Sequence, residues 1–202
     1  SDLMSVDAKK VKHLRDKTGA GMMDCKKALV ESSGDMEKAV DYLRKTGITK
    51  AEKKSARIAK EGLIYSYIHQ GNRLGVLLDI GCETDFVAKT EGFKEIAHNI
   101  SMQIAATNPI AIRREDVDPE LTDREKSIYH EQAKSSGKPE EIIDKIVEGK
   151  LNKFFQDNCL LEQTFIKDSE KNIQDLINEI IVTLGENISV NRFTRFAIGE
   201  DT

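Results

Sequence analysis

The sequence predicts an α+β fold, in which a small helical unit precedes a body made of a three-stranded antiparallel sheet and separate helices. Three observations predict it. Apolar residues recur at helical spacing through the first 47 residues. Two short aliphatic stretches, 63–69 and 74–80, flank a four-residue turn, and a third alternating stretch lies at 190–198. Strands that are not interleaved one by one with helices are typical of this class.

Residues 1–47, called the head below, are predicted to form three short helices. Thr18 and Gly19 end the first, the segment 32–34 ends the second, and Asp35 caps a third that closes at Gly47. The apolar residues of the three helices are Val6, Val11 and Leu14; Met22, Met23, Cys25, Ala28, Leu29 and Val30; and Met36, Ala39, Val40 and Leu43. Such a bundle is of minimal size and of marginal stability by itself.

A basic, alanine-containing connector, 48–60, follows the head and is predicted to be helical. The simpler interpretation is a solvated linker helix. The alternative is that its cations Lys53, Lys54 and Arg57 face an acidic surface.

The remaining residues, 61–202, form the predicted body. Between the first two strands, the segment 70–73 is a tight hairpin signal, with Gly71 free to adopt positive φ. Helical spacing predicts a helix over 90–107, a helical hairpin over 122–157 and a last helix over 171–184 that ends at Gly185. Pro139 suits the first turn of the hairpin's second arm. The stretch 159–166 is predicted to be extended.

The junction between the second strand and the helix after it, residues 81–89, is called the corner. Glu83, Thr84 and Asp85 suit a helix start, because their oxygens accept from free N–H groups and complement the helix dipole. Phe86 and Val87 follow directly. In one interpretation, both residues pack under the helix. Alternatively, Phe86 faces solvent and, beside a carboxylate, forms a wedge that disturbs a charged site in a partner.

Charge is unevenly distributed along the chain. Residues 1–60 contain 15 lysines and arginines against 9 aspartates and glutamates, a balance of +6, whereas the rest contain 16 against 26, a balance of −10. A basic balance over residues 1–60, the head and the connector together, indicates an acidic partner. Nucleic acid has little support as that partner, because Tyr42 is the head's single aromatic residue and base stacking needs more.

Composition also bounds the environment that we expect for the chain. No apolar run approaches the roughly 20 residues of a membrane span, and no signal-peptide pattern opens the chain. We expect Met4 to be the natural start. The three cysteines are distant in sequence and contain no CxxC pair, so a disulfide framework is not expected. We expect a reduced, cytoplasmic protein without membrane attachment.

Catalytic chemistry has little support in the sequence. The four histidines lie on different elements without metal-ligand spacing, and phosphate-binding loops and nucleophile elbows are not found. We therefore expect no metal, no cofactor and no enzyme. Two alternatives from other classes stay open: a small enzyme, which needs clustered titratable groups, and an RNA binder, which needs steep salt dependence.

Two long segments carry a resemblance to a known family. Residues 11–29, VKHLRDKTGAGMMDCKKAL, and residues 83–89, ETDFVAK, resemble the two signatures of elongation factor Ts. Four shorter segments are similar to the same family in the same order: 137–139, 147–149, 161–163 and 195–200. The resemblance spans nearly the whole chain.

The resemblance implies a guanine-nucleotide exchange factor for elongation factor Tu, bound in its GDP and nucleotide-free forms. The head then corresponds to a ubiquitin-associated-like (UBA-like) domain, whose contacts include Arg15, Thr18, Gly19, Met22, Met23 and Lys26, with Lys54 from the linker. At the corner, Thr84, Asp85, Phe86 and Val87 occupy the family's wedge, which inserts between partner helices beside Mg²⁺. The alternative is a UBA-like adaptor that binds a protein without exchange activity.

The resemblance also implies an oligomeric state. Short members of the family, with one three-stranded core, pair as homodimers, and this chain has room for one such core. Gln103 lies where a longer member carries a histidine that contacts the partner, and whether Gln103 makes that contact stays open.

Overall fold

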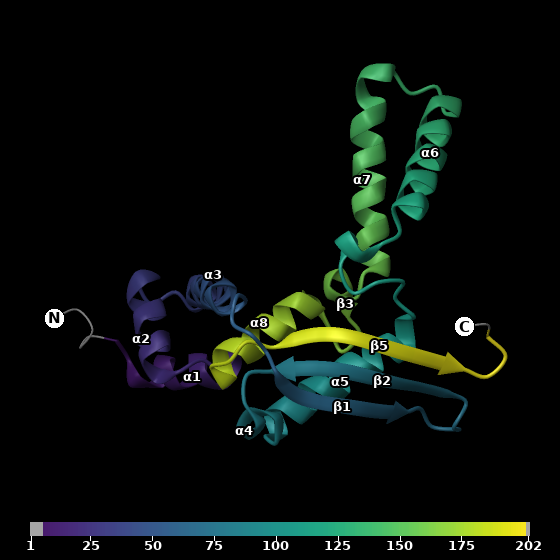
Figure 1. The fold of residues 1–202 in the computed structure, drawn as a ribbon. Coiled ribbons are helices and arrows are strands. Elements are labelled where there is room, and N and C mark those ends of the chain that lie inside the picture. The colour runs from purple at the N-terminus through teal and green to yellow at the C-terminus, as the bar shows by residue number, and fades with distance from the viewer. Residues whose placement is uncertain (1–5, 201–202) are drawn as a thin grey trace.

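The computed structural model describes residues 6–200, and the expected start at Met4 lies outside this range. The α+β class is confirmed: helices and an antiparallel sheet occupy separate segments of the chain. Figure 1 shows three parts, a helical head beside one end of the sheet, the sheet with its covering helices, and a helical hairpin that projects away from both. None of the helices within 6–200 is long and apolar enough to span a bilayer.

The head contains α1 (Ala8–Thr18), α2 (Met22–Glu31) and the start of α3 (Met36–Lys54). The third helix begins at the predicted cap, since Asp35 Oδ1 accepts from the backbone N–H of Lys38. Asp7, which was not predicted as a cap, accepts from the backbone N–H of Lys9 at the start of α1. The buried side chains form a small core of their own: Val11, Leu14, Cys25, Ala28, Leu29 and Ala39.

The prediction that the third helix closes at Gly47 is wrong, because α3 continues to Lys54. Gly47 lies against α8, where an added Cβ would be 3.9 Å from Val182. The helix continues because its second half packs on the body, and Arg44 adds an ion pair of 3.0 Å with Asp175. The predicted helical connector is therefore the end of α3, and the helix stops before residue 60.

The sheet is three-stranded and antiparallel, as predicted, and its strand order is β1-β2-β5. Its strands are β1 (Glu61–Ile68), β2 (Leu74–Cys82) and β5 (Ser189–Ala197). The turn between the first two strands has positive φ at Gly71, 96°, and at Asn72, 59°. The hairpin signal is confirmed.

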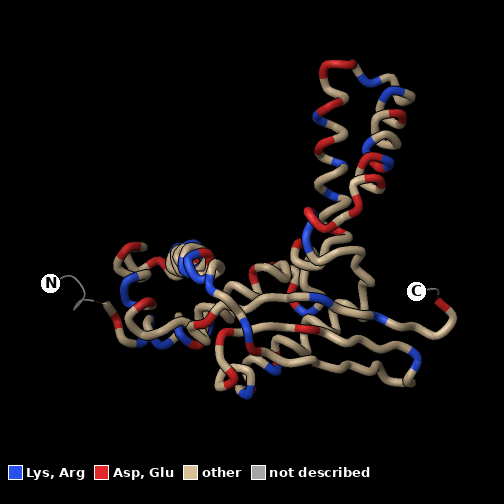
Figure 2. Tube along the Cα trace, viewed as in Figure 1, with Lys and Arg blue, Asp and Glu red and all other residues tan. Residues whose placement is uncertain are grey.

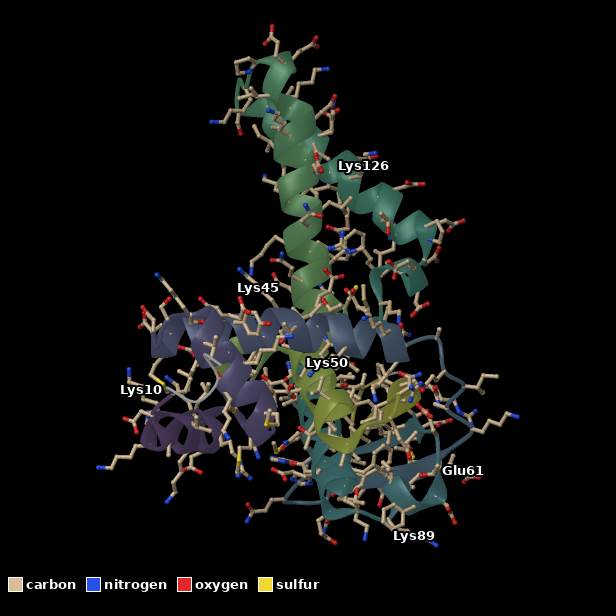
Figure 3. The ribbon with its side chains drawn as sticks, turned by 90° about the vertical axis from the view of Figure 1, so that its left-hand side faces the viewer. Lys10, Lys45, Lys50, Glu61, Lys89 and Lys126 are labelled. Atoms are coloured by element: carbon tan, nitrogen blue, oxygen red, sulfur yellow. The ribbon has the colours of Figure 1, made fainter. Side chains whose placement is uncertain are left out.

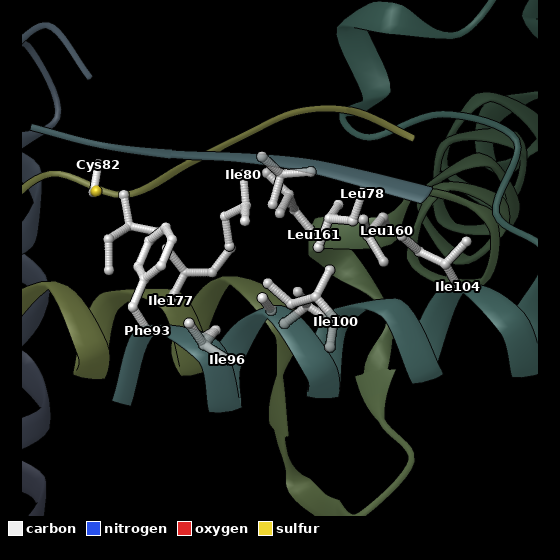
Figure 4. Packing of buried hydrophobic residues seen from close by; sticks show 14 of the residues in the cluster. Leu78, Ile80, Cys82, Phe93, Ile96, Ile100, Ile104, Leu160, Leu161 and Ile177 are labelled. Carbon is white, nitrogen blue, oxygen red and sulfur yellow. The ribbon is translucent and has the colours of Figure 1, made fainter. Parts of the chain in front are cut away.

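One face of the sheet is covered by α5 (Glu91–Thr107) and α8 (Ile173–Leu184). Figure 4 shows the apolar layer between the sheet and these helices, in which Leu78 and Ile80 of β2 face Ile96 and Ile100 of α5. Thr90 caps α5 by accepting from the backbone N–H of Phe93, and Gly185 ends α8 in the left-handed conformation. Both ends agree with the prediction. The one-turn helix α4 (Asp85–Ala88) connects β2 to α5.

The projecting hairpin consists of α6 (Pro119–Ser135) and α7 (Glu140–Asn158), as predicted, and Pro139 is the N-cap of α7. Arg114, in the 3-10 turn before α6, donates to Glu162 and Asn152, and thereby fixes the base of the hairpin. Residues 159–166 are not extended throughout, because Leu160–Glu162 forms a 3-10 turn. Within this stretch the strand is β3 (Thr164–Phe165), and Cys159 forms an isolated bridge with Ala111. β3 pairs with β4 (Asp168–Asn172), a strand that was not predicted.

Candidate protein-binding surfaces

The corner turns outward the residue expected to be a wedge. Phe86 is 78% exposed, whereas the next residue, Val87, is 5% exposed and belongs to the main core. Successive residues of a helix point about 100° apart, so the one-turn helix that follows the end of β2 turns one of the two outward. The interpretation that both pack under the helix holds for Val87 and fails for Phe86.

A carboxylate accompanies the exposed ring. The Asp85 side chain is 74% exposed and lies 3.7 Å from the Lys89 ammonium, an exposed pair that holds the carboxylate only weakly. Lys89 marks this end of α4 in Figure 3, on the side of the body opposite the hairpin. An aromatic ring and an available negative charge therefore protrude together.

The helix that carries Phe86 is capped and tied down. Thr84 Oγ1 accepts from the backbone N–H of Val87 at 3.3 Å, which satisfies a free donor at the helix start. The Cys82 thiol donates to the Thr84 carbonyl at 3.1 Å, and burial raises the pKa of this thiol. The loop after α8 contributes further bonds: the Glu186 carboxylate accepts from the backbone N–H groups of Glu83 and Thr84.

The head presents a second surface at the start of α2. Met22 is 49% exposed and Met23 is 63% exposed. Arg15, on the preceding helix α1, is also exposed. Gly19 ends α1 with φ of 71°, a conformation that favours glycine, and donates its N–H to the Arg15 carbonyl at 2.7 Å. Exposed methionines are flexible and polarizable, and such side chains recur on protein-binding surfaces.

Two further residues of this surface have supporting positions. Thr18 donates its hydroxyl to the Leu14 carbonyl at 2.7 Å and accepts from the Ala20 N–H, so it shapes the turn between α1 and α2. Lys26 is half-buried on α2.

Charged residues are spread over the head and the hairpin, whereas the strands of the sheet carry few (Figure 2).

Lys54, an expected contact residue, and Gln103, whose contact was left open, both have internal partners in the structure. Lys54 donates to the Gly185 carbonyl at 2.7 Å and so places its charge at the C-terminal end of α8. Gln103 is completely buried; its amide donates to Gln163 Oε1 and the Thr164 carbonyl and accepts from the Ile166 N–H. Gln103 therefore holds β3 against α5 and does not reach the surface.

Sequence patterns did not reveal the residues of the loop that follows α8. Glu186 and Asn187 reach residues about 100 positions earlier, and hydrogen bonds over that separation leave no periodic signal. The only local signal is Gly185, which marks the end of the helix. Within residues 6–200, no group of three or more His, Cys, Asp or Glu side chains is arranged to hold a metal ion.

A compact α+β body with an exposed aromatic at one corner and an exposed methionine pair on a small head is typical of a protein-binding factor. Comparison with known proteins makes this class specific. A sequence model described as elongation factor TS matches residues 8–200. The chain belongs to the elongation factor Ts family, and its role is that of a translation elongation factor.

Individual relatives are similar over almost their full lengths. Elongation factor Ts of Geotalea uraniireducens is 57% identical over 197 residues, which cover 98% of this chain and 91% of the relative. Those of Moorella thermoacetica and Thermosipho melanesiensis are each 56% identical over 195 residues. These cover 96% of this chain and 96% and 100% of the two relatives.

Proposed function

We propose that this chain is a guanine-nucleotide exchange factor for elongation factor Tu. The observation that carries the proposal is the outward ring of Phe86 beside the exposed Asp85 carboxylate, on a capped one-turn helix. The factor acts by binding, in the cytoplasm, and makes or breaks no covalent bond.

The exchange step follows from how GTPases hold GDP. They bind its phosphates through a phosphate loop and a Mg²⁺ ion that neutralises phosphate charge. Phe86 inserts between helices of the partner and displaces the elements that hold both, while Asp85 brings negative charge toward the Mg²⁺ site. Because binding free energies are reciprocal, a factor that weakens GDP is itself weakened equally by GDP. Each tenfold loss of GDP affinity requires about 1.4 kcal/mol of coupling.

The head supplies a second anchor on the same partner. Arg15, Met22, Met23 and Lys26, on the turn formed by Thr18 and Gly19, dock on the nucleotide domain of elongation factor Tu. Once the head is bound, the corner is presented at a high effective concentration, so the wedge needs little affinity of its own. The +6 balance of residues 1–60, the head together with the connector, supports an acidic surface as the docking site. We propose no direct contact with nucleic acid or membrane.

The protein is proposed to act as a homodimer that pairs through the uncovered face of the sheet. Five large apolar side chains on or beside this face are exposed: Ile64, Ile68, Leu77, Phe196 and Ile198. A second copy covers such a face with an identical apolar surface around a two-fold axis. Sedimentation equilibrium tests this: Leu77→Glu should give monomers with an unchanged circular dichroism spectrum, and a monomeric wild type would refute pairing.

Release of a fluorescent GDP analogue from elongation factor Tu, followed by stopped flow, tests the exchange activity. The wild type should accelerate release, and Phe86→Ala should remove most of the acceleration while remaining folded. Ile166→Ala is the matched control, because it removes a 48%-exposed apolar side chain from β3–β4, away from both surfaces. Binding without any change in release would instead favour the UBA-like adaptor. Unchanged release by Phe86→Ala would refute the wedge.

A further inference from the structure

The loop after α8 is joined to the corner by a set of bonds centred on one carboxylate. Glu186 Oε1 accepts from the backbone N–H groups of Glu83 and Thr84, each at 3.0 Å. Glu186 Oε2 accepts from the Thr84 hydroxyl at 2.7 Å. A single side chain therefore takes up three donors of the two residues that immediately precede α4, and charged acceptors make the stronger hydrogen bonds.

A bond in the reverse direction makes the connection reciprocal. The backbone N–H of Asn187 donates to Glu83 Oε1 at 2.8 Å. The Asn187 amide also donates to the Arg57 carbonyl at 2.8 Å, just after the end of α3. Since Gly185 ends α8, whose inner side chains lie in the main core, the loop transmits the position of a rigid helix to the corner. Figure 1 shows this end of α8 on the side of the sheet where α4 lies.

The Thr84 hydroxyl links the carboxylate to the wedge helix. Thr84 Oγ1 directs its proton to Glu186 and accepts from the Val87 N–H at 3.3 Å. A hydroxyl has one proton and two lone pairs, so the carboxylate fixes it as an acceptor toward the helix. Without the carboxylate, the hydroxyl rotates freely and caps α4 only part of the time.

We propose that Glu186 is a positioning residue that holds Phe86 ready for insertion. A four-residue helix is too short to be stable by itself, so its order comes from the bonds around it. An ordered ring does not lose conformational entropy again on binding, which favours insertion. This inference rests on the proposed exchange function, and it adds that exchange depends on a carboxylate that makes no contact with the partner.

Two substitutions of Glu186 separate its contributions. Glu186→Ala removes all three acceptor bonds, and we expect GDP release from elongation factor Tu at saturating factor to slow by about tenfold. Glu186→Gln keeps an oxygen that accepts from the two backbone N–H groups, but its amide nitrogen cannot accept from the Thr84 hydroxyl. We therefore expect GDP release to slow by about threefold. Glu179→Ala is the control, because the Glu179 carboxylate is an exposed group of α8 that accepts from Lys171 of β4.

The concentration dependence distinguishes positioning from loss of folded protein. The head governs the encounter, so the half-saturating concentration should stay within about twofold of the wild type while the saturating rate falls. A loss of folded protein would raise the apparent half-saturating concentration and leave the saturating rate intact. The effects of Thr84→Val and Glu186→Ala should be less than additive in the double variant, because both single variants weaken the bond between the Thr84 hydroxyl and the Val87 N–H.

Amide hydrogen exchange of the free protein provides a measurement that needs no partner. The Val87 amide should exchange several-fold faster in Glu186→Ala than in the wild type, while core amides of β2 stay protected. Equal Val87 protection and an equal saturating rate would overturn the positioning role. If wild type fails to accelerate GDP release, the proposed function falls, and Val87 exchange alone decides whether Glu186 orders the corner. If Glu186→Ala does not fold, Glu186→Gln decides by the same measurements.

Discussion

Phe86 and Val87 are neighbours in the chain and have opposite environments, the first 78% exposed and the second 5% exposed. Their separation follows from the single helical turn of α4, which sits at the end of a buried strand. One residue anchors the turn in the core, and the other is presented to a partner. Binding and folding are thus assigned to different side chains.

Urea unfolding of two matched variants tests this division. Phe86→Ala should change the free energy of unfolding by less than about 0.5 kcal/mol, as for other exposed sites. Val87→Ala should lower it by about 2 kcal/mol, since it removes two buried carbons and leaves a cavity. A large loss of stability in Phe86→Ala would show that the ring holds the fold together.

The sequence predicted the elements with strong apolar periodicity, but it could not show where local signals yield to packing. Apolar residues alternate along the strands of the main sheet and recur at helical spacing in α5, α7 and α8. The strand β4 is polar along its length, Asp168–Asn172, so no pattern marks it. Gly47 is a common helix stop, yet contact with α8 carries α3 past it.

Gly47 therefore gives a direct prediction about stability. An alanine there has ordinary van der Waals contact with Val182 at 3.9 Å, and the helix interior favours alanine over glycine. Gly47→Ala should raise the free energy of unfolding by about 0.5–1 kcal/mol. Thermal unfolding measures the change. A lower melting temperature would mean that the two helices need the smaller residue.

Gly62 and Gly71 both have positive φ but differ in their surroundings. At Gly62, with φ of 147°, an added Cβ would lie 2.1 Å from the Ile80 carbonyl oxygen on the paired strand. At Gly71, with φ of 96°, nothing lies within 4 Å. Gly62→Ala should therefore cost about 3 kcal/mol or more, because the backbone of β1 must move. Gly71→Ala should cost about 1–2 kcal/mol, from backbone strain alone. Chemical denaturation compares the two, and equal losses would contradict the role of the close approach.

The candidate surfaces were predictable in part, for a physical reason. Phe86 lies in a short segment that marks a helix start, so local reasoning proposed it as one of two alternatives, whereas Met22 and Met23 were indicated as contacts by the family resemblance. Glu186 acts on residues about 100 positions away through hydrogen bonds, and only the folded chain brings the two loops together. The burial and internal hydrogen bonds of Gln103 could not be predicted for the same reason, since its partners lie about 60 positions further along the chain.

The buried thiol of Cys159 makes stability depend on alkaline pH. Burial, with the nearby Glu162 carboxylate, raises the pKa of this thiol from 9.0 to about 11, against the opposing effect of Arg114. Above pH 9 the unfolded chain loses the thiol proton while the folded chain keeps it, so stability falls as pH rises toward 11. The full loss is about 3 kcal/mol, at about 1.4 kcal/mol for each pH unit between the two pKa values.

Urea unfolding of wild type and Cys159→Ala, at intervals from pH 7 to above pH 10, measures this contribution. Cys25, Cys82 and Tyr129 also have raised pKa values and add losses of the same sign, so the difference between the two proteins isolates the one thiol. The gap between them should be constant near pH 7–8 and should change in favour of the variant above pH 9. Parallel curves over the whole range would show that the thiol ionises in the folded chain as easily as in the unfolded one.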